Sequence, residues 1–158
     1  MKLVDVSDSF SRKGGGVRSY VLHKFVAARD AGHELVVVAP GERDEVEHVD
    51  GGRVIWIAGP RSPVDRGYGF FADEAAVHRV LDRERPDVIE ASSPWAGARF
   101  VASWPGRAPR VLVFHTDPVA VWGHTLLSPR VPFAAVDRLC TPWWRRFARM
   151  AAGFDATI

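Results

Sequence analysis

Three consecutive glycines, Gly14 to Gly16, stand between two cations and an apolar run in the segment SRKGGGVRSY. A helix that starts here would offer free backbone N–H groups and a close approach to a phosphate, and Arg18 could add a bidentate contact. No glycine-lysine-serine/threonine follows, which excludes a Walker A loop, and the third glycine of the dinucleotide fingerprint is missing. An anion-binding loop and a surface turn both stay open.

The segment FHTDP, residues 114–118, places a histidine and an aspartate at the end of an apolar run. In an open α/β sheet the carboxyl end of a strand faces the ligand cleft, so His115 could donate to a hydroxyl or phosphate or act as a general base. Asp117 could orient His115 or begin the turn before Pro118. A histidine that only bridges parts of the fold is the alternative.

Two further stretches carry polar groups. In EASSPW the hydroxyls of Ser92 and Ser93 could bind substrate or cap the helix that Pro94 begins. The segment WWRRFAR, residues 143–149, could contact an anionic surface or acceptor, or form a helix with tryptophan inward and arginine outward.

Composition removes several classes of function. The 158 residues carry a formal net charge of only +2 and no long basic run, so nucleic-acid binding is not expected. The single Cys140 excludes an intrachain disulfide. The spacing of His115, Asp117 and His124 matches no recognised metal site. No Gly-x-Ser-x-Gly elbow occurs, which argues against a Ser-His-Asp triad. With a poor signal peptide and no membrane-length apolar run, we expect a cytoplasmic protein, with or without peripheral contact at the inner face of the membrane.

Strands and helices alternate along the whole chain. The pattern predicts strands at 2–6, 34–40, 53–59, 86–92, 110–117 and from 155, and helices at 17–33, 70–85, from Pro94 to about Trp104, and at 131–154 with a break or kink at Pro142. The segment 41–52 is polar and predicts a surface connection. This alternation predicts an α/β, Rossmann-like three-layer sandwich with a mainly parallel sheet, in which the polar loops meet at the carboxyl edge.

The pieces GGGVRSYVLHKFVAARDAGHELVVVAPG, RPDVIEASSPWAGARFVA, RVLVFHTD and FDATI follow one another in this order. In order and spacing the chain resembles the N-terminal Rossmann-like domain of retaining GT-B glycosyltransferases of family 4. The resemblance implies that residues 1–158 are the acceptor-binding domain and that a C-terminal nucleotide-sugar domain is absent. The chain stops within a predicted strand, which agrees with one part of a longer enzyme.

The resemblance also implies a reaction and a set of site residues. The enzyme would transfer a hexose, such as mannose or glucose, from a nucleotide-sugar to an acceptor hydroxyl by front-face displacement, without a metal, and the isolated domain would be inactive. The implied set is Gly15 and Gly16 near the donor diphosphate, His115 near the transferred sugar as the catalytic residue, and Arg18 and Tyr20 facing the cleft or the acceptor. Ser92, Ser93 and Asp117 join these candidates as cleft residues because they lie at the carboxyl ends of predicted strands.

Two other functions fit the same residues. A free-standing Rossmann-like module could bind an anionic ligand or a partner protein through the Trp-rich C-terminal third, and half of a GT-B sugar-nucleotide epimerase would share the fold. A second α/β domain with two spaced glutamates after Ile158 would favour the transferase. The face that such a domain normally covers would be exposed in this chain, so we expect concentration-dependent self-association.

Overall fold

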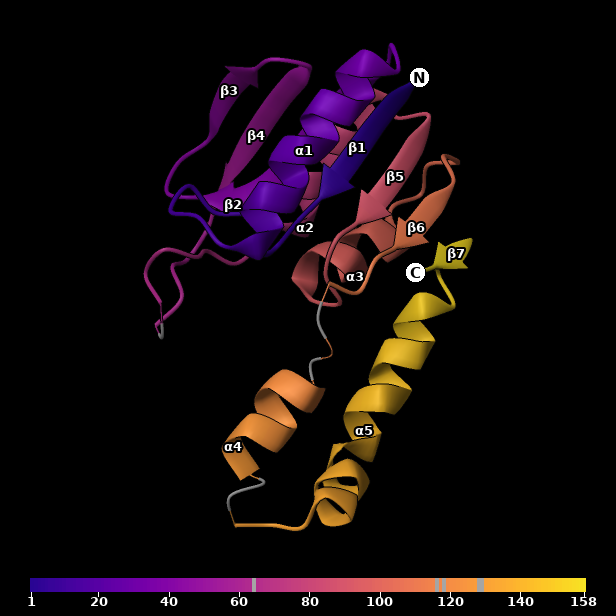
Figure 1. The fold of residues 1–158 in the computed structure, drawn as a ribbon. Helices are drawn as coiled ribbons and strands as arrows, with labels where there is room; N and C mark the ends of the chain where they lie inside the picture. The colour runs from indigo at the N-terminus through magenta and orange to yellow at the C-terminus, as the bar shows by residue number, and fades with distance from the viewer. Residues whose placement is uncertain (64, 116, 118, 128–129) are drawn as a thin grey trace.

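The computed structural model describes residues 1–63, 65–115, 117, 119–127 and 130–158. Within these residues a seven-stranded sheet has the order β3-β4-β2-β1-β5-β6-β7 (Figure 1). The strands are β1 Lys2–Val6, β2 Glu34–Gly41, β3 Glu45–Val49, β4 Gly52–Ala58, β5 Val88–Ala91, β6 Arg110–Leu112 and β7 Ala156–Thr157. Every pairing is parallel except β3 with β4, which confirms the predicted mainly parallel sheet.

Helices cover both faces of the sheet. They are α1 Gly16–Asp30, α2 Glu74–Glu84, α3 Ala96–Ser103, the short α4 Thr125–Leu127 and α5 Phe133–Ala151, with a π-helical segment at Val119–His124. On one face Val21 and Phe25 of α1 pack against Leu35 and Trp56, and on the other Leu81 and Phe100 belong to the core formed with α2 and α3. The predicted three-layer sandwich is therefore confirmed.

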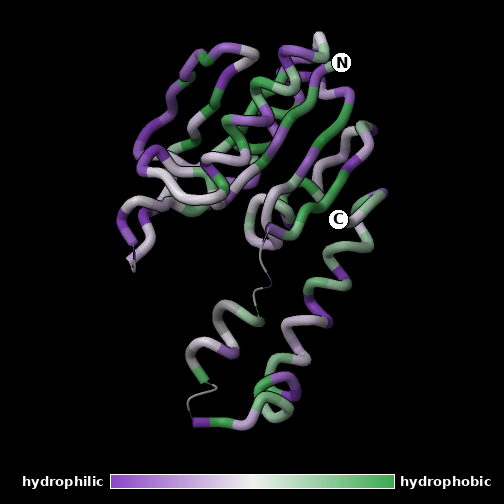
Figure 2. Tube along the Cα trace, in the orientation of Figure 1, coloured by the Kyte–Doolittle hydropathy of each residue, from purple (hydrophilic) through white to green (hydrophobic). Residues whose placement is uncertain are grey.

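Burial explains why the central strands read as continuous apolar runs. Val36, Val37 and Val38 of β2 are all fully buried because helices lie on both sides of the sheet. Each such side chain contributes about 1.5–3 kcal/mol through burial. Figure 2 shows the hydrophobic residues concentrated along these central strands.

The edge strand β3 was not expected from the sequence. Its segment EVEHV alternates between half-buried and exposed positions, and its charged side chains resemble those of a surface loop. It pairs antiparallel with β4, with Val46 opposite Ile55. A charged edge strand of this kind discourages pairing with a second chain, which is why its composition gave so weak a strand signal.

The ends of α1 and α2 follow familiar capping chemistry. Gly32 follows α1 at φ +70°, and the predicted glycine stop is confirmed. The helix predicted at 70–85 begins later, because the Asp73 side chain accepts from the Ala76 N–H and caps α2, while Phe71 packs into the core ahead of the helix. Arg85 ends α2 in the left-handed conformation.

Three predictions for the second half of the chain are corrected. The strand predicted at 110–117 ends at Leu112, and the helix α5 continues through Pro142, so the predicted break does not occur. Neither serine of EASSPW caps α3, whose N-terminal residue Trp95 makes no side-chain capping bond. The backbone N–H of Gly97 instead donates to the carboxylate of Asp8, 2.9 Å away and 89 residues earlier in the chain.

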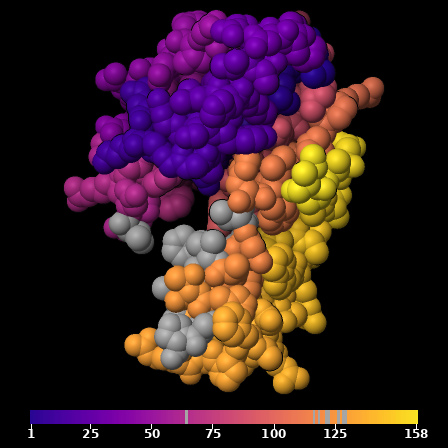
Figure 3. Space-filling view, viewed as in Figure 1, coloured from indigo at the N-terminus to yellow at the C-terminus, as the bar shows by residue number. Residues whose placement is uncertain are grey.

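The C-terminal third forms a lobe beside the sheet. Figures 1 and 3 show α4 and the first half of α5, in orange, extending below the body that the N-terminal residues build. Val119, Val136 and Cys140 form a small apolar core inside this lobe. No helix in the described part of the chain is long and apolar enough to cross a membrane.

Candidate functional site

The predicted histidine and tyrosine lie together at the carboxyl edge of the sheet. The rings of His115 and Tyr20 meet edge to face with centroids 4.6 Å apart, although 95 positions of sequence separate them. Tyr20 projects from the first turns of α1, and His115 follows β6. The Nε2 atom of His115 is buried and has no hydrogen-bond partner among the described residues, so it is a polar atom available to a ligand.

A buried ionic cluster lies beneath this ring pair. The Lys24 Nζ of α1 lies 2.8 Å from Asp5 Oδ2 and 2.7 Å from Glu90 Oε1, and the Ser92 hydroxyl donates to Asp5 Oδ1 over 2.6 Å. The Lys24 ammonium also lies 5.7 Å from the Tyr20 ring centroid, a cation–π distance. The cluster therefore connects β1, β5 and α1 and supports Tyr20 against His115.

The electrostatics of the cluster agree with its geometry. Burial alone would lower the pKa of Lys24, but the carboxylates of Asp5 and Glu90 outweigh burial and raise that pKa above its ordinary value. The pKa of Tyr20 is also raised, first by burial and then by the same two carboxylates, with Lys24 opposing. Lysine and phenol thus both stay protonated at neutral pH.

Sequence reasoning missed this cluster. Asp5 is the single acid of the apolar strand KLVDV, and Glu90 is the single acid of the apolar strand VIEA. An acid within such an apolar run is the one sequence signal that could have pointed to the cluster. A buried carboxylate needs a partner, and that partner, Lys24, is found on a helix rather than in either strand.

The glycine loop ends at the N-terminus of α1. Gly14 and Gly15 have φ angles of +118° and +103°, a region that side chains disfavour, whereas Gly16 is the first helical residue. A Cβ added to Gly16 would meet no atom within 4 Å, so its surroundings are open. No side chain caps the helix and no acid lies in its first turn. The first N–H groups of α1 therefore face an open space that suits an anion.

Arg18 and Asp117 have local partners. The Arg18 guanidinium donates to the Ser11 carbonyl over 3.5 Å and lies 5.9 Å from the Phe10 ring centroid, so it contacts the loop that leads to the glycines. Asp117 Oδ1 accepts from the N–H groups of Val119 and Ala120 at 2.8 and 3.1 Å. It therefore begins the π-helical segment, in line with the turn alternative.

The two serines of EASSPW are both buried. Ser92 is bonded to Asp5, as described, and to Glu90 Oε1 over 3.0 Å. The Ser93 hydroxyl lies 3.0 Å from the Ser9 hydroxyl and also donates to the Ser92 carbonyl. These contacts join the loops that follow β1 and β5.

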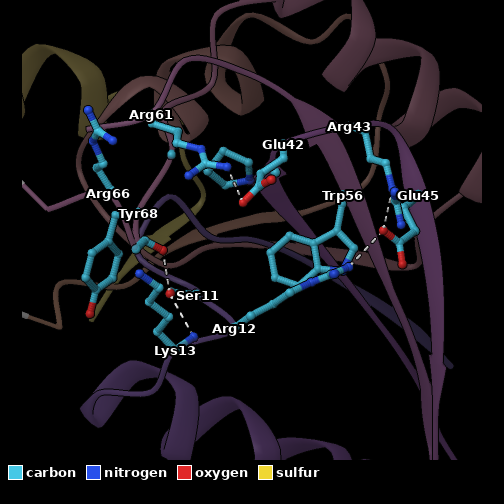
Figure 4. Close-up of a pocket in the computed structure, with 14 residues that line it drawn as sticks. Ser11, Arg12, Lys13, Glu42, Arg43, Glu45, Trp56, Arg61, Arg66 and Tyr68 are labelled. Atoms are coloured by element: carbon cyan, nitrogen blue, oxygen red, sulfur yellow. Dashed lines mark hydrogen bonds and ion pairs between the residues drawn. The ribbon is translucent and has the colours of Figure 1, made fainter. Parts of the chain in front are cut away.

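A basic pocket of about 280 Å³ lies beside the glycine loop (Figure 4). Three of the five cations that line it have acidic partners. One of these, the Arg12 guanidinium, lies 3.1 Å from Glu45 Oε2 and 4.6 Å from the Trp56 ring centroid. Lys13 and Arg66 also line it, and neither forms an ion pair with a described residue. The pocket adjoins the glycines, because Tyr68 Oη lies 3.0 Å from the position of a Cβ on Gly15.

Among the described residues, no three His, Cys, Asp or Glu side chains gather closely enough to hold a metal ion. The ligand-facing groups at this edge are instead backbone N–H groups, a histidine, a tyrosine and cations. Groups of this kind bind anions and hydroxyls.

The layered sheet defines a Rossmann-like domain, and the glycine-led helix beside the histidine that follows β6 gives it a candidate ligand site at the carboxyl edge of the sheet. Residues 15–157 match the model of the glycosyl transferase 4-like domain, and the chain belongs to this family. The family resemblance seen in the sequence is thereby confirmed.

One curated relative is a GDP-mannose-dependent alpha-mannosyltransferase from Corynebacterium glutamicum. It is 30% identical over 122 residues, which cover 74% of this chain and 30% of that protein. The chain thus spans less than a third of the length of this relative.

Proposed function

We propose that this chain is the N-terminal, acceptor-binding domain of a retaining GT-B glycosyltransferase that transfers a hexose from a nucleotide-sugar to an acceptor hydroxyl. The observation that carries the proposal is the uncapped, glycine-led N-terminus of α1 at the same sheet edge as the His115–Tyr20 ring pair, within a domain of this family. The name of the C. glutamicum relative makes GDP-mannose the first donor to test.

Gly15 and Gly16 are assigned to the donor diphosphate. The open space around Gly16 allows close approach, and the positive end of α1 stabilises the negative charge that grows on the diphosphate as the sugar leaves. No side chain has to supply a nucleophile in this scheme. The bond from the anomeric carbon to the diphosphate breaks, the bond to the acceptor oxygen forms on the same face, and the acceptor proton passes to the leaving phosphate.

His115 is assigned to the transferred sugar. Its buried Nε2 is free to bond a sugar hydroxyl, and Tyr20, held over Lys24, fixes the plane of the imidazole. A ring held in one orientation before the donor arrives loses little conformational entropy on binding. Tyr20 and Lys24 are therefore positioning residues and His115 is the catalytic one.

A second domain completes the site in this proposal. Most contacts to the nucleotide would come from a C-terminal domain outside these 158 residues, and no metal ion would be required. The isolated chain would then bind an acceptor without turning over the donor.

The test is a donor screen on the full-length polypeptide that contains this domain. His115→Ala removes a contact to the transferred sugar, whereas Gly16→Ala keeps the backbone N–H but places a methyl group in the open space assigned to the diphosphate. Each variant is expected to lower transfer from the preferred nucleotide-sugar about 100-fold, the usual effect of losing or misplacing one such contact. The exposed His33→Ala is the matched control and should leave turnover unchanged. Full turnover in both site variants would reject the site assignment, and no transfer from any nucleotide-sugar would reject the function.

The exposed apolar side chains of α5 favour self-association of the isolated chain. Phe133 and Leu139 are 67% and 64% exposed, and Trp144 lies on the same helix. Large apolar side chains that stay exposed along one helix favour association in water. Light scattering is expected to show a mass that rises with concentration, whereas a monomeric mass at the highest concentration would contradict this expectation.

A further inference from the structure

A second pocket lies between the carboxyl end of β1, the start of α3 and the second half of α5. Its volume is about 820 Å³, enough for a sugar with a substituent. The residues that matter for its chemistry are Asp8, Trp95, Arg99, Trp143, Arg146 and Arg149. We call it the arginine–aromatic pocket.

Asp8 is the buried polar group of this pocket. Its side chain is only 6% exposed, and Oδ2 accepts from the Gly97 N–H over 2.9 Å. The other oxygen, Oδ1, is buried and has no partner among the described residues. An unpartnered buried carboxylate oxygen is costly, and a donor supplied by a ligand would remove that cost.

Three arginines give the pocket a positive rim. Arg99 comes from α3, and Arg146 and Arg149 come from α5; none of them forms an ion pair with a residue that the structure describes. Among the described residues, Arg149 donates to the Arg145 carbonyl over 3.3 Å, and Arg99 lies 5.1 Å from the Phe100 ring centroid. Unpaired guanidiniums on two facing elements are suited to a carboxylate or phosphate.

Aromatic rings form the remaining wall. Trp95 and Trp143 stay 38% and 44% exposed, and Trp95 is held edge to face against Phe147 with centroids 6.1 Å apart. A flat apolar ring with one accessible face packs well against the C–H face of a pyranose. Hydroxyl acceptor, anion site and stacking surface thus occur together in one pocket.

We infer that the arginine–aromatic pocket binds the sugar ring of an acidic acceptor. One ring hydroxyl donates to Asp8 Oδ1, a carboxylate or phosphate on the acceptor pairs with the arginines, and Trp95 or Trp143 packs against the ring. This inference deepens the proposed function and rests on it, because it names the class of acceptor that the domain takes.

Tryptophan fluorescence of the full-length polypeptide, without donor, tests the inference. The probes are methyl glucuronide, glucose 6-phosphate and methyl glucoside, which share a ring and differ in carrying a carboxylate, a phosphate or no charge. At least one acidic probe should bind about tenfold or more tightly than the neutral one, and the tighter acid identifies the anionic group. Equal affinity for all three would overturn the inference.

Substitutions locate the binding. Arg146→Ala should weaken the preferred acidic probe about tenfold and leave methyl glucoside unchanged, while Asp8→Asn should weaken all three probes. Arg138→Ala, an exposed arginine of the same helix outside the pocket, is the matched control. Because Arg146 is exposed, its variant tests the pocket even if Asp8→Asn fails to fold. Acidic-probe binding that survives Arg146→Ala would overturn the inference.

The two proposals fail in different ways. If the protein prefers an acidic probe but transfers sugar from no nucleotide-sugar, the inference about the pocket stands and the proposed transferase function is rejected. Transfer by a protein that shows no preference for acidic probes rejects the pocket and keeps the transferase.

Discussion

Two acidic residues three positions apart, Asp5 and Asp8, have opposite environments. Both carboxylate oxygens of Asp5 have partners: Oδ2 pairs with the Lys24 ammonium, and Oδ1 accepts from the Ser92 hydroxyl. Asp8 accepts from the Gly97 N–H, and its buried Oδ1 has no partner among the described residues. Asp8 lines a pocket with three arginines that form no ion pair with those residues. The first arrangement holds the fold and the ring pair in place, whereas the second leaves bonding capacity for a ligand.

The difference has a measurable consequence in the pKa of Asp8. Burial raises this pKa from 3.8 to about 7, while the Gly97 N–H and the charge of Arg99 act in the opposite direction. Buried acids with perturbed pKa values beside an open pocket are typical of functional sites. A buried acid with full pairing, such as Asp5, is more typical of structural support.

Removing the cation that pairs with Asp5 should have the largest effect on stability. Lys24→Met leaves two buried carboxylates without their cation, and we expect a loss of about 3–5 kcal/mol in the free energy of unfolding at pH 7. Urea denaturation measures it. Lys13→Met, an exposed lysine near the glycine loop, is the control and should change stability by less than about 0.5 kcal/mol. A similar loss in both variants would contradict a special role for the cluster.

The titration of Asp8 should have the next largest effect on stability. Between pH 4 and pH 7 the folded chain holds a proton on Asp8 that the unfolded chain has already lost, so this group makes stability fall as pH rises through that window. Asp8→Asn removes this titrating group. The free energy of unfolding of the variant, relative to that of the natural chain, should therefore grow from pH 4 to pH 7 by an amount on the order of 2–4 kcal/mol. Denaturation at several pH values measures it; a difference that does not change with pH would refute the assignment.

Crowding Asp8 should have a smaller effect. A Cβ on Gly97 would lie 2.7 Å from Asp8 Oδ2 and 3.1 Å from side chains of Phe71 and Val6. Gly97→Ala should therefore cost about 1–3 kcal/mol and lower the affinity for acidic probes. Gly16→Ala is the control, because the added methyl meets no atom there. Equal melting temperatures for Gly97→Ala and the natural chain would show that the contact relaxes freely.

Much of the fold was predictable because its signals are local. Apolar, β-branched runs such as ELVVVAP are typical of strands buried on both faces, and a glycine stop such as Gly32 ends a helix by its own backbone freedom. The edge strand β3 was missed, and α5 runs through Pro142 where a break or kink was predicted. Pairing with β4 and packing within the C-terminal lobe decide those two elements, and neither interaction can be recognised in a short stretch of sequence.

The candidate site was predictable only in part. The places of Gly15 and Gly16 at the start of α1 and of His115 after β6 could be predicted from local sequence signals, whereas their roles stay a prediction. Ser92 and Ser93 fit a capping pattern, yet the cap of α3 comes from Asp8 at the far end of the chain. A cap supplied across such a distance leaves no periodic or positional trace in the sequence.

The sequence by itself determined the alternation of strands and helices, the glycine-led start of α1 and the presence of a histidine after β6, since each depends on local propensity and backbone geometry. Only the tertiary structure decided which acids are paired. Lys24 lies over Asp5 and not over Asp8 because α1 covers one face of β1, while the loop after β1 carries Asp8 to the start of α3 on the other. The partners of a buried charge depend on packing between elements distant in sequence.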